Sequence, residues 1–200
     1  MGSIRSTVGK DNATQEASKP RSFDDNEIRA LVECAATGDV EAFGELYSFY
    51  LDRIYRYVKY QVRSKEAAED LTEEIFLKAW RGLGKYRWDG YPFSAWLYRI
   101  ARNHVVDYFR TNRQYQNVEM ELLPGDSDPE REVESKQMEQ LLASAISYLP
   151  EQQRQVIVLK FIEGMDNREI EQIMGMRQGA IRVMQMRALA TLRQKLGGKE

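Results

Sequence analysis

The sequence has almost none of the residues that bind soft metals or form disulfides. Of its 200 residues, one is a cysteine, Cys34, and one is a histidine, His104. A single cysteine excludes an internal disulfide and a cysteine-based zinc site, and it suits a reducing cytosol. A single histidine leaves too little for a histidine metal site or a Ser/His/Asp triad. We therefore expect no metal and no other cofactor, and we interpret His104 as a surface or helix-packing residue.

Long apolar runs are also missing. No segment approaches the ~20 apolar residues that cross a bilayer, and residues 1–22 lack the apolar stretch of a secretory signal. This polar N-terminal tail shows no hydrophobic periodicity, which is typical of disorder. We expect a cytoplasmic protein without membrane insertion.

The net charge of −2 conceals blocks of one sign. Residues 66–77 carry five acids and no base, whereas residues 78–113 carry eight bases and two acids. Residues 114–140 reverse this balance with eight acids and two bases, and residues 177–195 carry five bases and no acid. Two basic blocks indicate two surfaces that face a polyanion. Scattered, solvated helix faces would give the same counts.

Hydrophobic spacing predicts an all-α protein with two small helical domains, because no segment alternates as a strand does. The first domain spans residues 23–113, with helices that begin near Asp24 or Asp25, near Ala42, at Ser64 and near Ser94. Residues 114–134 contain Pro124-Gly125 and Asp128-Pro129, which predict an irregular acidic linker. The second domain spans residues 135–197. Between the last two helices of the first domain, residues 83–93 are rich in glycine and predict a loop.

The second domain ends in a helix-turn-helix pattern. Pro150 opens a helix that ends at Gly164, and a short helix over 167–174 is followed by a turn at Gly175 and a basic helix from Gln178. Any helical hairpin with a basic surface would give a similar pattern. If the pattern is a DNA reader, the second helix lies in the major groove.

A step of ~100° per residue separates the two faces of that basic helix. Ile181, Met184, Ala188 and Leu192 share the face that packs on the domain, whereas arginines lie on the opposite face. Arginine pairs bidentately with guanine, and apolar side chains contact thymine methyl groups. The predicted DNA contacts of this helix and the turn before it are Arg177, Gln178, Arg182, Val183, Met186 and Arg187.

Four methionines cluster in this hairpin as two Met-x-Met pairs. The helical register sends their sulfur atoms apart, which argues against a copper-binding box. We interpret Met174, Met176 and Met184 as core residues that fill irregular gaps, and only Met186 as a DNA contact.

Two long segments resemble one family. LPEQQRQVIVLKFIEGMDNREIEQIMGMRQGAIRVMQMRALATLRQKL is similar to region 4 of group 4, or extracytoplasmic-function (ECF), sigma factors. AAEDLTEEIFLKAWRGLGKYRW followed by FSAWLYRIARNHVVDYFR is similar to regions 2.2 to 2.4 of the same family. The resemblance covers residues 24–196 and implies a promoter-specificity subunit of bacterial RNA polymerase with no catalytic activity of its own.

The resemblance also implies partners and sites. Region 2 would dock on the clamp helices of the largest polymerase subunit through Asp70, Glu73 and Glu74, and region 4 would bind the flap of the second-largest subunit. Region 4 would read the −35 element, and an anti-sigma factor would restrain the protein. The loop from Lys85 to Ser94 would capture a flipped base of the −10 element, and the next helix would follow the melted strand. The residues implied for −10 DNA are Lys85, Tyr86, Arg87, Trp88, Tyr91, Arg99, Arg102, Asn103, Arg110 and Arg113.

Two other interpretations stay open at this point. A free-standing helix-turn-helix regulator would bind duplex DNA as a dimer on a palindrome, but it would leave the aromatic loop and the acidic helix without a role. An enzyme acting on nucleic acid would need carboxylates clustered for metal ions, and the basic blocks contain no such grouping. Trp80 and Trp96 are interpreted as core residues in each case.

Overall fold

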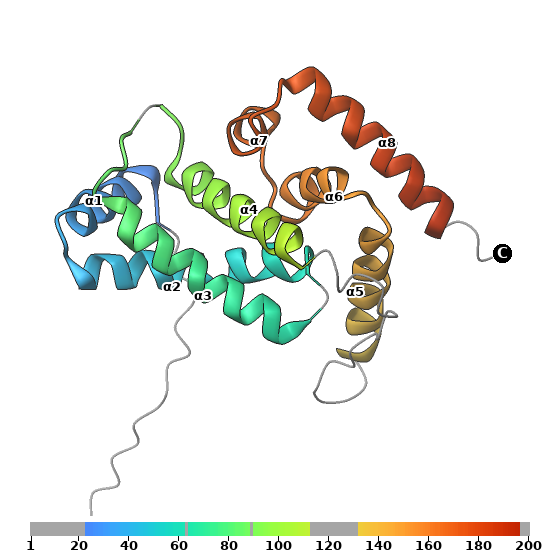
Figure 1. The fold of residues 1–200 in the computed structure, drawn as a ribbon, viewed down its shortest axis with the longest axis horizontal. Helices are drawn as coiled ribbons and strands as arrows, with labels where there is room; N and C mark the ends of the chain where they lie inside the picture. Colours follow the sequence, from blue (N-terminus) through green and yellow to red (C-terminus); the bar gives the residue numbers. More distant parts are fainter. Residues whose placement is uncertain (1–22, 63, 89, 113–131, 197–200) are drawn as a thin grey trace, which may run out of the picture.

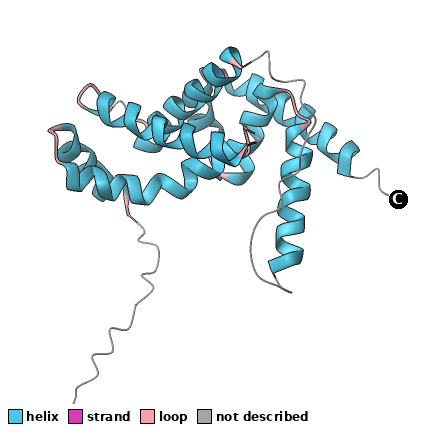
Figure 2. Cartoon of the chain, turned by 60° about the horizontal axis from the view of Figure 1, so that its bottom comes forward, coloured by secondary structure: helices cyan, strands magenta, loops and turns pink. Residues whose placement is uncertain are grey.

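The computed structural model describes residues 23–62, 64–88, 90–112 and 132–196. Every regular element in these ranges is a helix (Figures 1 and 2). The predicted all-α class is confirmed. Most of the predicted linker, the N-terminal tail and Arg113 lie outside the described residues.

Four helices form the N-terminal unit: α1 (Asp25–Ala36), α2 (Val40–Lys59), α3 (Lys65–Leu83) and α4 (Phe93–Thr111). Three of them begin at a side chain that accepts hydrogen bonds from the first turn, namely Asp24, Asp39 and Ser64. Asp24 and Glu27 form a reciprocal capping box on α1. Pro92 precedes α4 and makes no side-chain cap. Local sequence thus fixes where each helix starts.

The core of this unit is dense in aromatic residues. Ile54, Tyr57 and Val58 of α2 are fully buried, and the rings of Tyr57 and Tyr98 meet edge to face at 5.5 Å. Burial of one large apolar side chain contributes roughly 1.5–3 kcal/mol to folding. Trp80 packs against Phe43, as its interpretation as a core residue requires.

The C-terminal unit consists of α5 (Glu132–Ser147), α6 (Glu151–Ile157), the π-helix η2 (Val158–Ile162), α7 (Asn167–Met174) and α8 (Gln178–Leu196). Helix α5 begins at Glu132, inside the segment predicted to be linker. The sequence predicted one α-helix from Pro150 to Gly164. In the structure its second half is wound as a π-helix, in which the Glu163 N–H donates to the Val158 carbonyl at 3.0 Å.

Two local features shape the hairpin of α7 and α8. Asp166 and Glu169 form a capping box at the start of α7. Gly175 ends α7 with φ of 66°, a left-handed conformation that favours glycine. The Gln185 side chain then donates to Asn167 Oδ1 at 2.9 Å and ties the two helices together.

The two units pack against each other along α4. Helix α7 lies against α4 (Figure 1), and η2 contacts α2. As a result, the helix that precedes the predicted −35 reader rests beside the loop predicted to capture −10 DNA.

Candidate nucleic-acid interface

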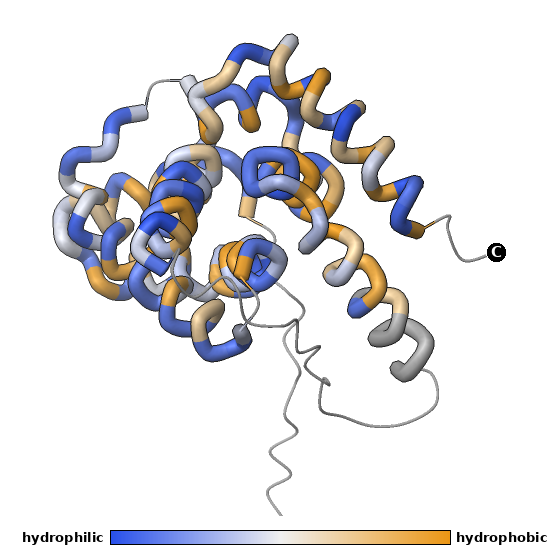
Figure 3. Tube along the Cα trace, turned by 45° about the vertical axis from the view of Figure 1, so that its right-hand side comes forward, coloured by the Kyte–Doolittle hydropathy of each residue, from blue (hydrophilic) through white to orange (hydrophobic). Residues whose placement is uncertain are grey.

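Helix α8 presents the face that its periodicity predicted. Ile181, Ala188 and Leu192 are buried against the unit, and Figure 3 shows hydrophilic residues interspersed with hydrophobic ones along the helix. Met186 is 67% exposed. The outward residues are Arg182, Val183, Met186 and Arg187. Residues 177–195 contain no acid, so this face of α8 suits contact with a phosphate backbone and base edges.

The start of α8 differs in detail from the prediction. Arg177 is exposed in the turn, where its side chain is open to solvent. Gln178 is half-buried, because its side-chain amide donates to Glu171 Oε2 at 3.0 Å. In this conformation Gln178 braces α8 against α7, so contact with a base requires that this hydrogen bond be exchanged.

The methionines separate as predicted. Met174 is buried on α7, whereas Met176 and Met184 are partly buried and pack against the core. Only Met186 points to solvent from the outward face of α8.

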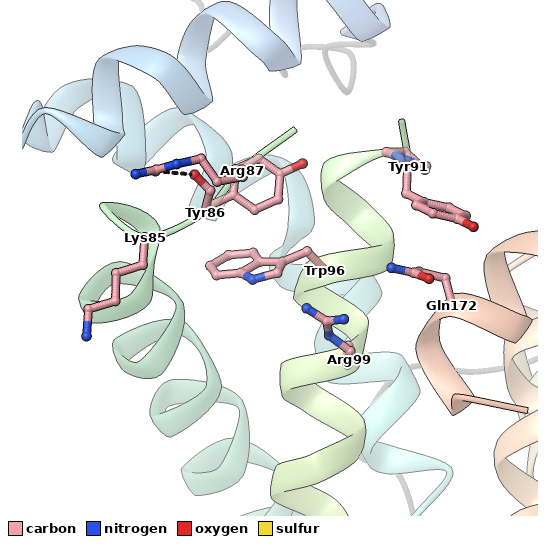
Figure 4. Close-up of a pocket in the computed structure, with 8 residues that line it drawn as sticks. Lys85, Tyr86, Arg87, Tyr91, Trp96, Arg99 and Gln172 are labelled. Atoms are coloured by element: carbon pink, nitrogen blue, oxygen red, sulfur yellow. Dashed lines mark hydrogen bonds between the residues drawn. The ribbon is translucent and has the colours of Figure 1, made fainter. Parts of the chain in front are cut away.

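The loop between α3 and α4 surrounds a cavity of about 220 Å³ (Figure 4). Tyr86 stacks at an angle on Trp96, with ring centroids 5.1 Å apart, so Trp96 belongs to the cavity wall as well as to the core boundary. Arg87 donates to the carbonyl of Tyr86 at 2.9 Å, which fixes the loop backbone. The lining residues are Lys85, Tyr86, Arg87, Tyr91, Pro92, Trp96, Arg99 and Gln172. Aromatic faces beside cations are the chemistry that binds an unstacked base.

Arginines from elsewhere in the chain cover two of the predicted base-capturing rings. The Arg29 guanidinium of α1 lies 5.5 Å from the ring of Trp88. The Arg168 guanidinium of α7 lies 5.5 Å from the ring of Tyr91, and Gln172 extends from α7 toward the same cavity (Figure 4). Sequence reasoning missed Arg29, Arg168 and Gln172, because their position depends on how the helices pack.

The basic residues of α4 are divided between solvent and internal contacts. Arg99 and Asn103 are exposed, and Arg99 reaches the cavity. Arg102 donates to Gln155 of α6 at 3.2 Å, and Arg110 lies 3.1 Å from Asp107. One predicted backbone-tracking residue, Arg102, is therefore held by the C-terminal unit.

Comparison with known proteins decides the family. The model named Sigma-70 region 2 matches residues 46–115, and the model named Sigma-70, region 4 matches residues 139–192. The ECF RNA polymerase sigma factor ShbA of Streptomyces griseus is 32% identical over 83% of this chain and 93% of its own length. This chain belongs to the ECF sigma factors.

One further sequence relative and one solved structure extend the comparison. The ECF RNA polymerase sigma factor BldN of Streptomyces coelicolor is 39% identical over 84% of this chain, which spans 66% of the length of BldN. The solved structure of CnrH, in complex with the cytosolic domain of CnrY, matches 87% of this chain and 99% of its own with a TM-score of 0.68 and 26% identity. Both units of this sigma factor therefore have structural counterparts.

The sigma factor has an acidic face on α3. Asp70, Glu73 and Glu74 are exposed, and Leu77, one turn further on, is 53% exposed beside them. The spacing from Asp70 to Leu77 places both on one helix face, a signal that sequence reasoning had not used.

His104 connects this acidic face to α4. Its Nδ1 lies 2.6 Å from Lys78 Nζ and its Nε2 lies 2.7 Å from Glu74 Oε2. A lysine ammonium only donates, so the short contact with Lys78 is one in which Nδ1 accepts. His104 is buried, in agreement with a helix-packing role.

The sigma factor also buries a carboxylate between its two units. Glu163, at the end of η2, has a side chain that is 1% exposed, and Arg56 of α2 donates to both of its oxygens at 2.9 and 3.2 Å. The Tyr98 hydroxyl of α4 donates to Oε2 at 2.6 Å. The hydrogen bond to Glu163 raises the pKa of Arg56. Burial, with the carboxylate beside it, raises the pKa of Tyr98 well above its ordinary value, so the phenol stays a donor.

None of the helices in the described ranges combines the length and the apolar character needed to span a membrane. Within the same ranges, no three His, Cys, Asp or Glu side chains are grouped in a way that could hold a metal ion.

Proposed function

We propose that this sigma factor directs core RNA polymerase to promoters by contacting DNA at two places. Residues 135–197 would act as region 4 and read the −35 element through α8. Residues 23–113 would act as region 2 and capture the −10 element through the loop before α4. The factor would add recognition and strand capture, and the polymerase would supply the chemistry, so we expect no enzymatic activity from this chain.

The observation that carries the proposal is the cavity beside Tyr86, Tyr91 and Trp96. Extrusion of a base from a duplex costs a few kcal/mol, which stacking at ~1–3 kcal/mol per base offsets. Lys85, Arg87 and Arg99 place cations where the phosphates of the opened strand would pass. A regulator that only binds duplex DNA has no use for such a cavity.

The acidic face of α3 supports docking on the polymerase. Asp70, Glu73 and Glu74 would meet basic residues of the clamp helices of the largest subunit, with Leu77 as an apolar contact in their midst. The C-terminal unit would meet the flap of the second-largest subunit. Because it would act with core polymerase, the factor would work in the cytoplasm.

A protein partner that restrains the factor is also part of the proposal. CnrH, whose fold matches both units, was solved with the cytosolic domain of CnrY bound. An anti-sigma factor of comparable kind would occupy this chain when transcription is off.

Run-off transcription tests the proposal. Purified core polymerase is mixed with a library of promoter fragments, with and without the full-length chain. We expect a defined subset of promoters to yield transcripts only when the chain is present. The double variant Glu73→Lys and Glu74→Lys should abolish these transcripts while binding of −35 duplex by the free chain persists. Absence of any promoter-specific transcript, together with tight binding of a palindromic duplex by the chain alone, would instead establish a free-standing regulator.

A further inference from the structure

We propose that Glu163 is a latch between the two units that keeps the free sigma factor closed over its own −10 loop. The latch consists of Glu163, Arg56 and Tyr98. A buried carboxylate is stable only when its charge is paired and its oxygens are hydrogen-bonded. Within the described residues, Glu163 meets this condition across the junction, because its three side-chain hydrogen bonds come from Arg56 of α2 and Tyr98 of α4, both in the other unit. Separation of the units removes every one of these bonds.

The closed arrangement covers the surfaces proposed to bind −10 DNA, and the inference rests on that proposed role. Arg168 of α7 lies over the ring of Tyr91, and Gln172 lines the same cavity. Arg102, proposed to follow the melted strand, is hydrogen-bonded to Gln155, which is fully buried. A base cannot stack on the face of Tyr91 that Arg168 occupies. Closure and strand capture are therefore competing states.

The junction also contains polar groups without hydrogen-bond partners among the described residues, beside the apolar core that continues from one unit to the other. Tyr57 Oη and both side-chain polar atoms of Gln61 are buried and make no hydrogen bond within the described residues. Buried polar groups of this kind favour exposure to water. Arg154 donates to the Gln61 carbonyl at 3.0 Å and lies over Phe109. Unsatisfied polar groups lower the stability of the closed junction, so the fully paired Glu163 contributes to holding it closed.

The winding of η2 explains how Glu163 reaches the junction. The Glu163 N–H donates to the carbonyl of Val158, five residues back, instead of to the carbonyl of Leu159, four residues back. This shift by one residue turns the following side chain by ~100° relative to a continuous α-helix. The π-helix thus aims Glu163 at Arg56, and π-helical insertions occur often at functional positions.

The consequence is a penalty on DNA binding by the free factor. When only the open fraction is competent, the apparent dissociation constant equals the intrinsic value divided by that fraction. Core polymerase, by binding each unit separately, would hold the open state and remove the penalty.

Energy transfer between two dyes on the full chain tests the latch. One dye is attached to the native Cys34, which is exposed on α1, and the other to a cysteine introduced by Gln194→Cys at an exposed position of α8. The latch variants are Glu163→Gln and, from the other unit, Arg56→Gln. The matched control is Glu69→Gln, which breaks an exposed ion pair with Lys65 within α3, away from both dyes and from the −10 loop. Affinity is then measured for a single-stranded non-template oligonucleotide from a promoter selected by run-off transcription.

We expect one short dye separation in the wild type and in Glu69→Gln, and a longer, broader distribution in both latch variants. Their affinity for the oligonucleotide should rise about fivefold or more, the lower bound typical of coupling between sites. Wild-type separations in both variants would overturn the latch. Longer dye separations without a gain in affinity would overturn the claim that the closed state blocks −10 DNA from its loop. Circular dichroism checks the fold of each variant. If Glu163→Gln unfolds the C-terminal unit, the dye separation and the affinity of Arg56→Gln test the latch instead. The dye separation needs neither DNA nor polymerase, so it judges the latch even if run-off transcription rejects the proposed function.

Discussion

Arg187 is the residue whose proposed role can be measured most simply. It is exposed on the outward face of α8, one residue after the exposed Met186 and five after Arg182. A bidentate arginine–guanine contact discriminates against other bases, whereas an arginine on phosphate does not. The two roles predict different effects of the same truncation.

We predict that Arg187→Ala weakens binding to the preferred −35 duplex by ~1–3 kcal/mol and relaxes sequence preference at one position. Arg193→Ala removes the same charge from the exposed end of the same helix. It should weaken binding to all sequences alike and lower the salt dependence. Fluorescence anisotropy with duplexes that vary at each −35 position makes the comparison. Identical effects of the two substitutions on every duplex would assign Arg187 to the backbone.

The directions of side chains on α8 could be predicted from sequence, because helical geometry alone fixes them. Ile181 and Ala188 face inward and Arg182 and Arg187 outward, as the register requires. The contact of Arg168 with Tyr91 could not be predicted. These residues lie on different units, and no local rule states how two units joined by a linker pack.

At the scale of the element, α7 depends on its cap. A helix of eight residues has too few internal hydrogen bonds to be stable alone. The Asp166 side chain accepts from the N–H groups of Arg168 and Glu169 at 2.8 Å, and the Glu169 carboxylate accepts from the Asp166 N–H. Because α7 supports α8, its stability carries over to DNA recognition.

We predict that Asp166→Ala lowers the free energy of unfolding by ~0.5–2 kcal/mol. Asp166→Asn keeps an oxygen that accepts from the backbone and should cost far less. Urea denaturation gives the free energies, and hydrogen exchange should locate the loss of protection in α7. An Ala variant with the wild-type denaturation midpoint would show that tertiary packing alone maintains this helix.

Caps and turns were the elements that sequence could locate, because each depends on a few adjacent residues. Ser64 precedes α3 as expected, and Gly175 ends α7 in the left-handed conformation. The π-helix over Val158–Ile162 was predicted to be an ordinary α-helix. Its apolar pattern suits either winding, and the choice is made by tertiary contacts such as those of Glu163 with Arg56 and Tyr98.

At the scale of the whole molecule, two units that each suit DNA are held in one closed body. In the free factor the −10 loop is covered, whereas the outward face of α8 is exposed. The two surfaces are therefore unequally accessible to DNA. Duplex −35 DNA can approach Arg182 and Arg187 at once, whereas −10 DNA must first displace Arg168 and Gln172. Recognition would therefore proceed from the −35 element to the −10 element.

Strand opening in the −10 region is the most direct test of the central claim that this factor captures melted promoter DNA. The holoenzyme, assembled from core polymerase and the full chain, is placed on a selected promoter, and permanganate reports unpaired thymines. We predict reactive thymines in the −10 region with the wild type and with Trp88→Phe, which keeps an aromatic face. Trp88→Ala should lose this reactivity while closed-complex binding remains. Paired thymines throughout the −10 region with the wild-type holoenzyme would contradict the account.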